Sequence, residues 1–403
     1  MTDLSSLDAP APDAADMLAA VRSEALAAPE SGIVEVFNYG RGRQGLIPLW
    51  VGEGDMATPA FITDAATRSL VAGETFYTHQ RGVPELREAL GRYMTRLYGR
   101  DLPAERFFVT VGGMHALQLA FRIAAGAGDE VLIPSPSWPN FLGALAVVGA
   151  TPVEVPMTVQ PGRGWTLDID DLAAAVTPRT RVIVINSPAN PTGWTASRDE
   201  LAAILALARR HGLWIIADEI YGRFVFDGTP RSASFHDVMD EGDRVLFVQT
   251  FSKNWAMTGW RIGWLECHPS LGQIIENLMQ YSCSGVATFM QRAATVALEQ
   301  GEGFVAHQID RVNRGRAIVS DGLAATGRVS FAAPGGAFYL FFKVEGEDDS
   351  RALALRLVDE ANVGIAPGAA FGAGGDDHLR LCFARRAEDL QEATRRLSAA
   401  ILR

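Results

Sequence analysis

Short apolar runs alternate with longer amphipathic runs between about residues 100 and 270 of this chain. Short runs rich in Val, Ile and Leu are typical of strands buried on both faces of a parallel sheet, and longer amphipathic runs are typical of covering helices. The alternation therefore predicts an α/β fold with a mostly parallel central sheet flanked by helices. The predicted strands are 107–111, 130–134, 151–155, 182–186, 213–218, 245–250 and 260–266.

Polar side chains precede two of the amphipathic runs. Ser197 stands before the predicted helix 198–210, and Asp168 and Asp170 stand before the predicted helix 171–176. Hydroxyl and carboxylate oxygens at such positions accept hydrogen bonds from the amide groups that a first helical turn leaves free.

The pattern changes after residue 290. A run at 290–323 predicts one long helix, and the elements after it predict a smaller α+β domain. Those elements are a strand pair at 329–333 and 338–344, a helix at 349–361, and a last strand and helix within 379–402. We expect an N-terminal flexible arm at 1–30, a large domain at 61–292, and a small domain formed by 31–60 together with 293–403.

Composition and charge exclude several classes of function. The chain has 403 residues and is 48% hydrophobic, which allows two packed domains. It has neither an apolar run long enough to span a bilayer nor a basic region followed by an apolar one at its start, so we expect a cytoplasmic protein. A net charge of −11 without a basic cluster makes nucleic acid an unsuitable partner. The three cysteines, Cys267, Cys283 and Cys382, predict neither a disulfide framework nor a metal site.

One dinucleotide-binding pattern lacks its structural context. Gly40, Gly42 and Gly45 fit G-x-G-x-x-G, which requires a helix directly after it. Residues 46–51, with Pro48, predict extended chain instead. We therefore expect a loop at these glycines.

Lys253 stands just past the predicted strand 245–250, at the expected rim of the sheet. Partial desolvation there lowers the pKa of a lysine and frees its amine for Schiff-base chemistry. Arg261 offers an anion-binding group nearby. A reactive lysine and an anion site suit pyridoxal phosphate, which has one aldehyde and one phosphate. The alternative is an ordinary surface lysine after a strand.

Asp218 ends the apolar run 213–218, and Tyr221 follows it. A carboxylate at the end of so apolar a strand needs a cationic partner, and the protonated ring nitrogen of pyridoxal phosphate is one. A helix N-cap is an equally weighted alternative for Asp218. Tyr221 either directs its hydroxyl at the ring oxygen of the same cofactor or packs as a half-buried aromatic residue.

Three further strand ends carry suitable groups. Asn190, in a rigid Asn-Pro turn, can donate to the ring oxygen, and Trp138 can stack on an aromatic ring. Gly113 opens a predicted helix whose amide groups can approach a phosphate. Each residue also has a plain structural explanation. One cofactor explains them together, because ligands of open α/β sheets bind at the shared rim of the strand ends.

With these residues in view, the chain resembles the class I/II aminotransferases, which are fold-type-I pyridoxal phosphate enzymes. The resemblance covers about residues 49 to 380 and is more specific for fold and cofactor than for substrate. It rests on GEGDMATP at 52–59, YTHQRGVPELR at 77–87, NPTG at 190–193, SK at 252–253 with Arg261, PGGAFY at 334–339 and HLR at 378–380.

The resemblance implies a role for each matching residue. Lys253, Asp218 and Tyr221 are the implied catalytic residues, with Lys253 holding the cofactor covalently and moving a proton at the substrate Cα. Arg380 grips the substrate α-carboxylate. Tyr77 is contributed by a neighbouring subunit, which implies a homodimer with shared active sites. The other implied contacts are Asn190 and Tyr221 to the ring oxygen, Trp138 to the ring, Arg261, Thr250, Ser252, Gly113 and Met114 to the phosphate, and Gly52, Trp138 and Asn190 to the substrate.

Two positions depart from the family pattern. Aspartate-specific bacterial members often have a lysine after the two glycines, where this chain has Met114 and then His115, so an acidic substrate is less secure. Arg41 and Arg43 either supply the missing charge or are solvated. Gly54 stands where many relatives have proline, which gives the segment near the substrate carboxylate more freedom.

The sequence predicts an aminotransferase that moves the amino group of an L-amino acid to a 2-oxo acid by a ping-pong mechanism. Aspartate and glutamate, or a broad range of amino acids, are the expected substrates. Two alternatives stay open: a lyase, an oxidase or another reaction at Cα on the same scaffold, and a non-catalytic sensor domain that binds pyridoxal phosphate.

Overall fold

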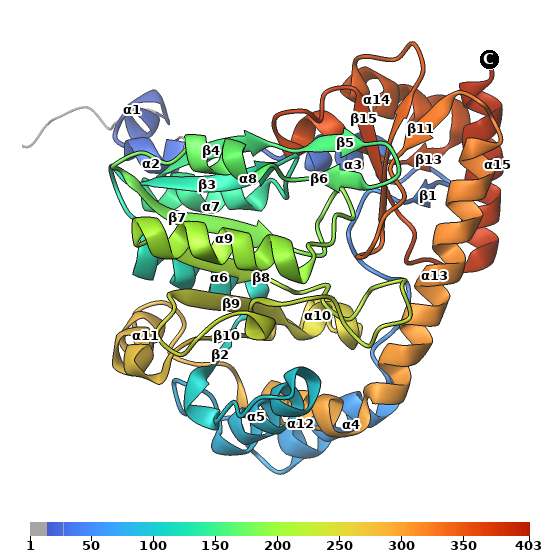
Figure 1. Ribbon diagram of the computed structural model, residues 1–403. Helices are drawn as coiled ribbons and strands as arrows, with labels where there is room; N and C mark the ends of the chain where they lie inside the picture. Colours follow the sequence, from blue (N-terminus) through green and yellow to red (C-terminus); the bar gives the residue numbers. More distant parts are fainter. Residues whose placement is uncertain (1–13, 27) are drawn as a thin grey trace, which may run out of the picture.

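The computed structural model describes residues 14–26 and 28–403, and a seven-stranded sheet forms its centre (Figure 1). The strand order is β2-β10-β9-β8-β7-β3-β4, and every pair is parallel except the two that β10 forms. Each apolar run predicted to be a strand belongs to this sheet. The strands are β2 (Phe107–Thr110), β3 (Glu130–Ser135), β4 (Thr151–Pro156), β7 (Thr180–Asn186), β8 (Trp214–Asp218), β9 (Val245–Thr250) and β10 (Gly263–Glu266).

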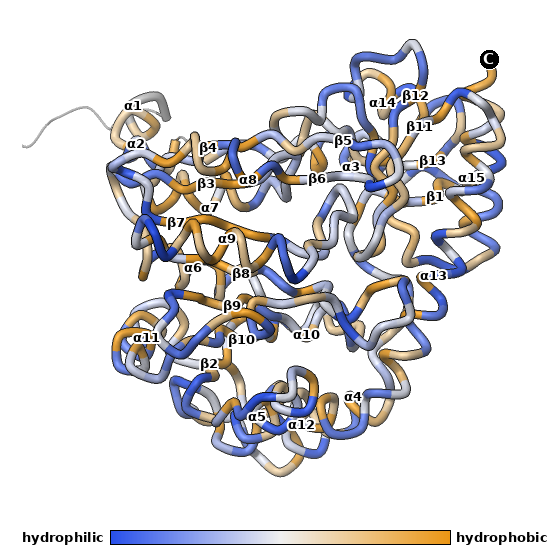
Figure 2. Tube along the Cα trace, in the orientation of Figure 1, coloured by the Kyte–Doolittle hydropathy of each residue, from blue (hydrophilic) through white to orange (hydrophobic). Residues whose placement is uncertain are grey.

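Helices cover both faces of the large sheet. All residues of β2, β3, β9 and β10 are buried, which explains why these runs are mainly apolar, with polar residues at their ends. In Figure 2 the hydrophobic colour follows the central strands, whereas peripheral helices carry much hydrophilic colour. The covering helices are α6 (Gly112–Ala124), α7 (Asn140–Val148) and α11 (Gly272–Gln280) on one face, and α8 (Ile169–Ala174) and α9 (Arg198–His211) on the other.

Two predicted helix starts can be compared with the structure. Ser197 caps α9 and accepts the Glu200 N–H at 3.2 Å, as predicted. Asp168 accepts the Asp170 N–H at 2.8 Å and caps α8. Asp170 itself lies inside the first turn, because α8 begins at Ile169, earlier than predicted.

A second, antiparallel sheet has the order β11-β12-β15-β14. The N-terminal segment joins this part of the molecule, because β1 pairs with β13 and α3 packs against β14 and α14. The predicted domain division at residues 61 and 293 stays a prediction. The elements here are α3 (Gly32–Gly40), β1 (Ile47–Pro48), α13 (Glu302–Ala324), β11 (Val329–Phe331), β12 (Tyr339–Val344), α14 (Ser350–Ala361), β13 (Val363–Gly364), β14 (Ala366–Pro367), β15 (His378–Cys382) and α15 (Ala387–Ile401), and a separate hairpin joins β5 (Thr158–Gln160) to β6 (Gly164–Thr166).

Part of the predicted flexible arm, residues 1–13 and 27, lies outside the described residues. The rest contains two short helices, α1 (Ala14–Ala19) and α2 (Ser23–Leu26), and α2 lies against α7. Gly40 is the last residue of α3, whereas Gly42 and Gly45 lie in the connection to β1, so the predicted loop is confirmed for these two glycines.

The prediction of one long helix at 290–323 is wrong. The chain forms α12 (Thr288–Gln300) and α13, separated at Gly301. A Cβ at Gly301 would lie 2.5 Å from the Trp255 indole nitrogen, so the indole packs directly on the backbone and only glycine fits. In Figure 1, α13 runs from the group formed by α12, α4 (Ala60–Val71) and α5 (Pro84–Tyr98) towards the small sheet.

The predicted strand 260–266 begins late, at Gly263. Residues Thr258–Trp260 form a 3₁₀ turn, and Arg261 adopts a φ of +53°, which no strand residue takes. Among the residues that the structure describes, no helix is both long and apolar enough to cross a membrane.

Candidate active site

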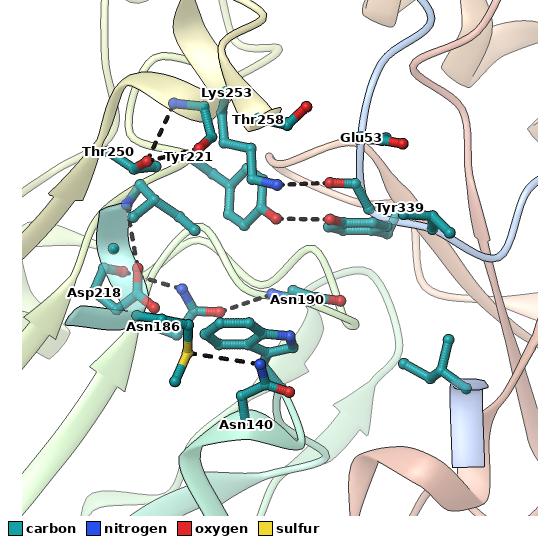
Figure 3. A pocket seen from close by; sticks show the side chains of 18 of the residues that line it. Glu53, Asn140, Asn186, Asn190, Asp218, Tyr221, Thr250, Lys253, Thr258 and Tyr339 are labelled. Atoms are coloured by element: carbon teal, nitrogen blue, oxygen red, sulfur yellow. Dashed lines mark hydrogen bonds between the residues drawn. The ribbon is translucent and has the colours of Figure 1, made fainter. Parts of the chain in front are cut away.

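A cavity of about 500 Å³ opens at the carboxyl ends of β7, β8 and β9 (Figure 3). The large sheet forms one side, and residues 50–53 with two side chains of the small sheet form another. The cavity brings together the predicted site residues other than Tyr77. They are Gly52, Gly113, Met114, Trp138, Asn190, Asp218, Tyr221, Thr250, Ser252, Lys253, Arg261 and Arg380.

Tyr77 lies elsewhere, in the connection between α4 and α5. Its side chain is 98% exposed, and it does not line the cavity of its own chain. Its predicted contribution to a neighbouring subunit stays a prediction.

Lys253 lies in α10 (Phe251–Asn254), the short helix that follows β9 directly. The Thr250 hydroxyl accepts the Ser252 N–H at 3.1 Å and so turns the chain from the buried strand into this helix. Lys253 Nζ donates to the Gly52 carbonyl at 2.6 Å, as Figure 3 shows. Burial lowers the pKa of Lys253 from 10.5 to about 8, so much more of its amine is unprotonated at neutral pH than for an exposed lysine.

Asp218 is buried at the end of β8, and its carboxylate accepts the Ile220 N–H at 3.3 Å. No cationic side chain within residues 14–26 and 28–403 forms an ion pair with it. Burial therefore raises the pKa of Asp218 from 3.8 to about 7. A cation entering the cavity beside this carboxylate would offset the free-energy cost of burying its charge.

Asn186 is a cavity residue that the sequence did not single out. It pairs in register with Asp218, donates from Nδ2 to the Asp218 carbonyl at 3.1 Å, and accepts the Asn190 N–H at 2.8 Å. Asn186 thus joins two neighbouring strand ends. In the sequence, only its position at the end of a predicted strand could have indicated that Asn186 lies in the site.

Tyr339 is a second residue without a predicted role. Its hydroxyl lies 2.6 Å from the Tyr221 hydroxyl, and burial raises the pKa of both phenols. A Cβ at Gly52 would lie 2.2 Å from the Tyr339 hydroxyl, so this close contact requires glycine at position 52. The PGGAFY motif contained Tyr339, but nothing in that pattern indicated the contact.

Arg380 reaches the cavity from β15, the strand between β12 and β14. It is buried, donates from Nη1 to Asn190 Oδ1 at 3.1 Å, and donates from Nη2 to the Trp50 carbonyl. Its guanidinium lies 4.6 Å from the centre of the Tyr339 ring. These contacts fix the orientation of a planar donor group that is suited to a carboxylate.

An anion site lies at the start of α6. Gly112 begins this 13-residue helix with a φ of +76°, and a Cβ there would lie 2.8 Å from Arg261 Nη2. Arg261 Nη1 donates to the Thr258 carbonyl at 2.7 Å. The free amide groups of the first turn, the guanidinium and the Ser252 hydroxyl together favour a phosphate group.

The N-terminal segment contributes a wall that the sequence did not reveal. Ile33, Val34 and Phe37 of α3 line the cavity. Their role depends on how α3 packs on the small sheet, and no local pattern encodes that contact. Arg41 and Arg43 do not line the cavity.

The residues present fit pyridoxal phosphate. The cavity contains a buried carboxylate without an ion-pair partner and a desolvated amine, and the start of α6 at Gly112 lies against the Arg261 guanidinium. Trp138, held edge-on against Phe141 at 5.6 Å, offers a flat ring at the same cavity. Within the described part of the chain, no group of three or more His, Cys, Asp or Glu side chains could hold a metal ion.

Comparisons with known proteins agree with this geometry. The family "Aminotransferase class I and II" matches residues 45–397. The "Probable aspartate/prephenate aminotransferase" of Aquifex aeolicus is 36% identical over 88% of this chain and 91% of its own length. The "Aromatic-amino-acid aminotransferase 2" of Thermococcus litoralis is 33% identical over 92% of this chain and 95% of its own length.

A solved structure supports the predicted fold. The aspartate aminotransferase of Thermus thermophilus, as a single mutant, has a TM-score of 0.87 at 33% identity and covers 94% of this chain and 99% of its own. The fold-type-I prediction is therefore confirmed. The named substrates of these relatives differ, so similarity alone does not select a substrate for this chain.

Proposed function

This chain belongs to the class I and II aminotransferases, a pyridoxal phosphate-dependent family, and we propose that it binds this cofactor and moves an amino group from an L-amino acid to a 2-oxo acid in two half-reactions. The observation that carries the proposal is the amine of Lys253, which has a lowered pKa and shares one cavity with the buried Asp218 and Arg380. When bound, the cofactor supplies an electron sink that stabilises negative charge at the substrate Cα.

Asp218, Tyr221 and Asn190 would hold the cofactor ring. The Asp218 carboxylate would keep the ring nitrogen protonated. The positive charge on that nitrogen would in turn offset the free-energy cost of burying the carboxylate charge. The Tyr221 hydroxyl and the Asn190 amide would donate to the ring oxygen, and Trp138 would cover one ring face. Arg261, Thr250, Ser252 and the first amide groups of α6 would bind the phosphate.

Lys253 would attach the cofactor covalently and then move a proton at the substrate Cα. Its amine lies at the cavity wall against the Gly52 carbonyl, and its lowered pKa provides the unprotonated form that can accept a proton near neutral pH.

Arg380 would bind the α-carboxylate that every amino acid and 2-oxo acid presents. Replacing Arg380 with leucine is expected to raise KM for every amino acid and to lower kcat/KM by about 100-fold, because a buried, charge-assisted pair is lost. Steady-state kinetics with several donors measures this effect. A loss confined to one donor would contradict the assignment.

The proposed enzyme is a homodimer with shared active sites. Tyr77 is 98% exposed, and neighbouring Phe76 is 85% exposed, which is unusual for adjacent aromatic side chains unless a partner covers them. We expect sedimentation equilibrium to give twice the mass of one chain. A monomer at working concentrations would rule out a role for Tyr77 in a second active site.

A further inference from the structure

Five charged side chains line the cavity, and the proposed function already uses all three of the cations. Lys253 and Arg261 serve the cofactor, and Arg380 serves the substrate α-carboxylate. The two remaining charges are the carboxylates of Asp218 and Glu53. A second carboxylate on a substrate would therefore find no free cation among the side chains that this one chain contributes to the cavity, and an unpaired carboxylate is strongly disfavoured away from water.

Arg41 and Arg43 do not supply a cation for a second substrate carboxylate. Arg43 forms an ion pair with Asp359 at 2.6 Å and lies 4.7 Å from the centre of the Tyr39 ring. The Tyr39 hydroxyl donates to the same carboxylate at 2.9 Å. Arg43 is thus committed to α14, and Arg41 is not among the cavity-lining residues.

One wall of the cavity is apolar and partly exposed. Val34 is 51% exposed and Phe37 is 37% exposed, and both line the cavity from α3 together with Ile33. Phe37 is oriented by an edge contact with Trp50, with ring centres 5.6 Å apart. Apolar surface left exposed inside a ligand cavity favours an apolar ligand group that covers it.

The start of α6 extends this apolar surface. Met114 and Leu117, one turn apart, line the cavity, and Asn140 Nδ2 contacts the Met114 sulfur at 3.6 Å. Met114 also lines an adjoining cavity of about 510 Å³ together with Ser31, next to the start of α3, so these two helices border the same space.

The Glu53 charge lies on the other side of the cavity. Figure 3 shows Glu53 near Tyr339, whereas Asn140, which contacts Met114, lies at the opposite side. Burial lowers the pKa of Lys253, and the negative charge of Glu53 opposes part of this shift. Glu53 therefore interacts with Lys253 and not with the space beside Met114. Where the main cavity lies between α3 and α6, its lining therefore combines apolar side chains with a neutral amide. The adjoining cavity also carries Glu30, Glu35 and Arg351, and Arg351 is ion-paired with Glu35.

We propose that the amino donor carries an apolar side chain, aromatic or branched aliphatic, which binds between α3 and α6. The proposal rests on the proposed function, because that function assigns Arg380 to the α-carboxylate and leaves the substrate side chain to the other walls of the cavity. An apolar binding space of this kind favours aromatic and branched aliphatic donors among the broad range of amino acids and disfavours aspartate and glutamate.

The first test is a panel of donors added singly to the holoenzyme without an acceptor. The absorbance change of the cofactor gives kcat/KM for the first half-reaction. We expect L-phenylalanine and L-leucine to exceed L-aspartate and L-glutamate by about 100-fold. Conversion with aspartate or glutamate at an equal or higher rate would overturn the proposal, and so would a clear preference for L-arginine, which would make Glu53 the side-chain partner.

The second test measures binding without turnover. We expect 3-phenylpropanoate to bind the holoenzyme about 100-fold more tightly than succinate, measured by calorimetry. The variant Met114→Lys is expected to reverse this order by adding a cation at the start of α6, whereas the neutral control Met114→Gln is expected to gain no affinity for succinate. Equal gains in both variants would contradict the charge argument.

These outcomes separate the two claims. If no donor changes the cofactor spectrum, the proposed function fails. If acidic donors alone change it, the proposed function stands and the side-chain inference fails.

Discussion

Replacing Lys253 with alanine is expected to abolish amino transfer and to leave the fold intact. The variant removes the one amine that lines the cavity, and loss of a covalent catalytic group costs at least about 10⁵-fold in kcat. The side chain donates to a single carbonyl, that of Gly52, and its amine lines the cavity, so its removal breaks one hydrogen bond and enlarges an existing cavity. The rate with any active donor measures this effect.

The chain offers a matched control, because it contains just two lysines, Lys253 and Lys343. Lys343 lies on β12, where it is ion-paired with Asp377 at 2.5 Å, and it does not line the cavity. Lys343→Ala is expected to keep full activity. A Lys253→Ala variant with near-normal turnover and an unchanged melting temperature would contradict the assigned mechanism.

The second large effect is expected for Asp218→Asn, which should lower kcat by about 1,000-fold. The amide keeps the shape of the carboxylate but cannot hold the ring nitrogen of the cofactor protonated. Glu219→Gln is the matched control, because burial raises the pKa of Glu219 to about 7 as well, while its carboxylate bonds to Ser234 outside the cavity. We expect this control to lose less than about tenfold in kcat.

Asp218→Asn should also raise the free energy of unfolding of the cofactor-free chain. The folded-state pKa of Asp218 is raised from 3.8 to about 7, so folding is penalised where the unfolded chain would ionise this carboxyl. The penalty is absent below pH 3.8, grows as the pH rises, and is complete above about pH 7, where it is worth roughly 4 kcal/mol. Chemical denaturation at about pH 8 should therefore show Asp218→Asn to be more stable than the parent, and a less stable variant would contradict this account of the site.

The large sheet was predictable because most residues of its central strands are buried on both faces. Runs such as Val245–Thr250, which begins with four apolar residues, are then mainly apolar, and this signal survives without any tertiary information. The polar residues that end these runs were predictable for the same reason. Asp218 and Lys253 stand out against the apolar residues before them, and the structure brings both to one cavity.

Other features depend on contacts between distant segments. The helices separate at Gly301, where the Trp255 indole, remote in sequence, leaves no room for a side chain, and a glycine inside a helical pattern does not show this contact by itself. The α3 wall exists because α3 packs on β14 and α14. The contact between the Tyr221 and Tyr339 hydroxyls likewise joins the two sheets, so no local pattern indicated it.

The most direct test of the central claim is to locate the cofactor on the chain. The protein is incubated with pyridoxal phosphate, reduced with sodium borohydride and mapped by peptide mass spectrometry. The account predicts one stable phosphopyridoxyl group, on Lys253, and none on Lys343. Labelling of Lys343 or the N-terminus in preference to Lys253, or no labelling at all, would contradict it.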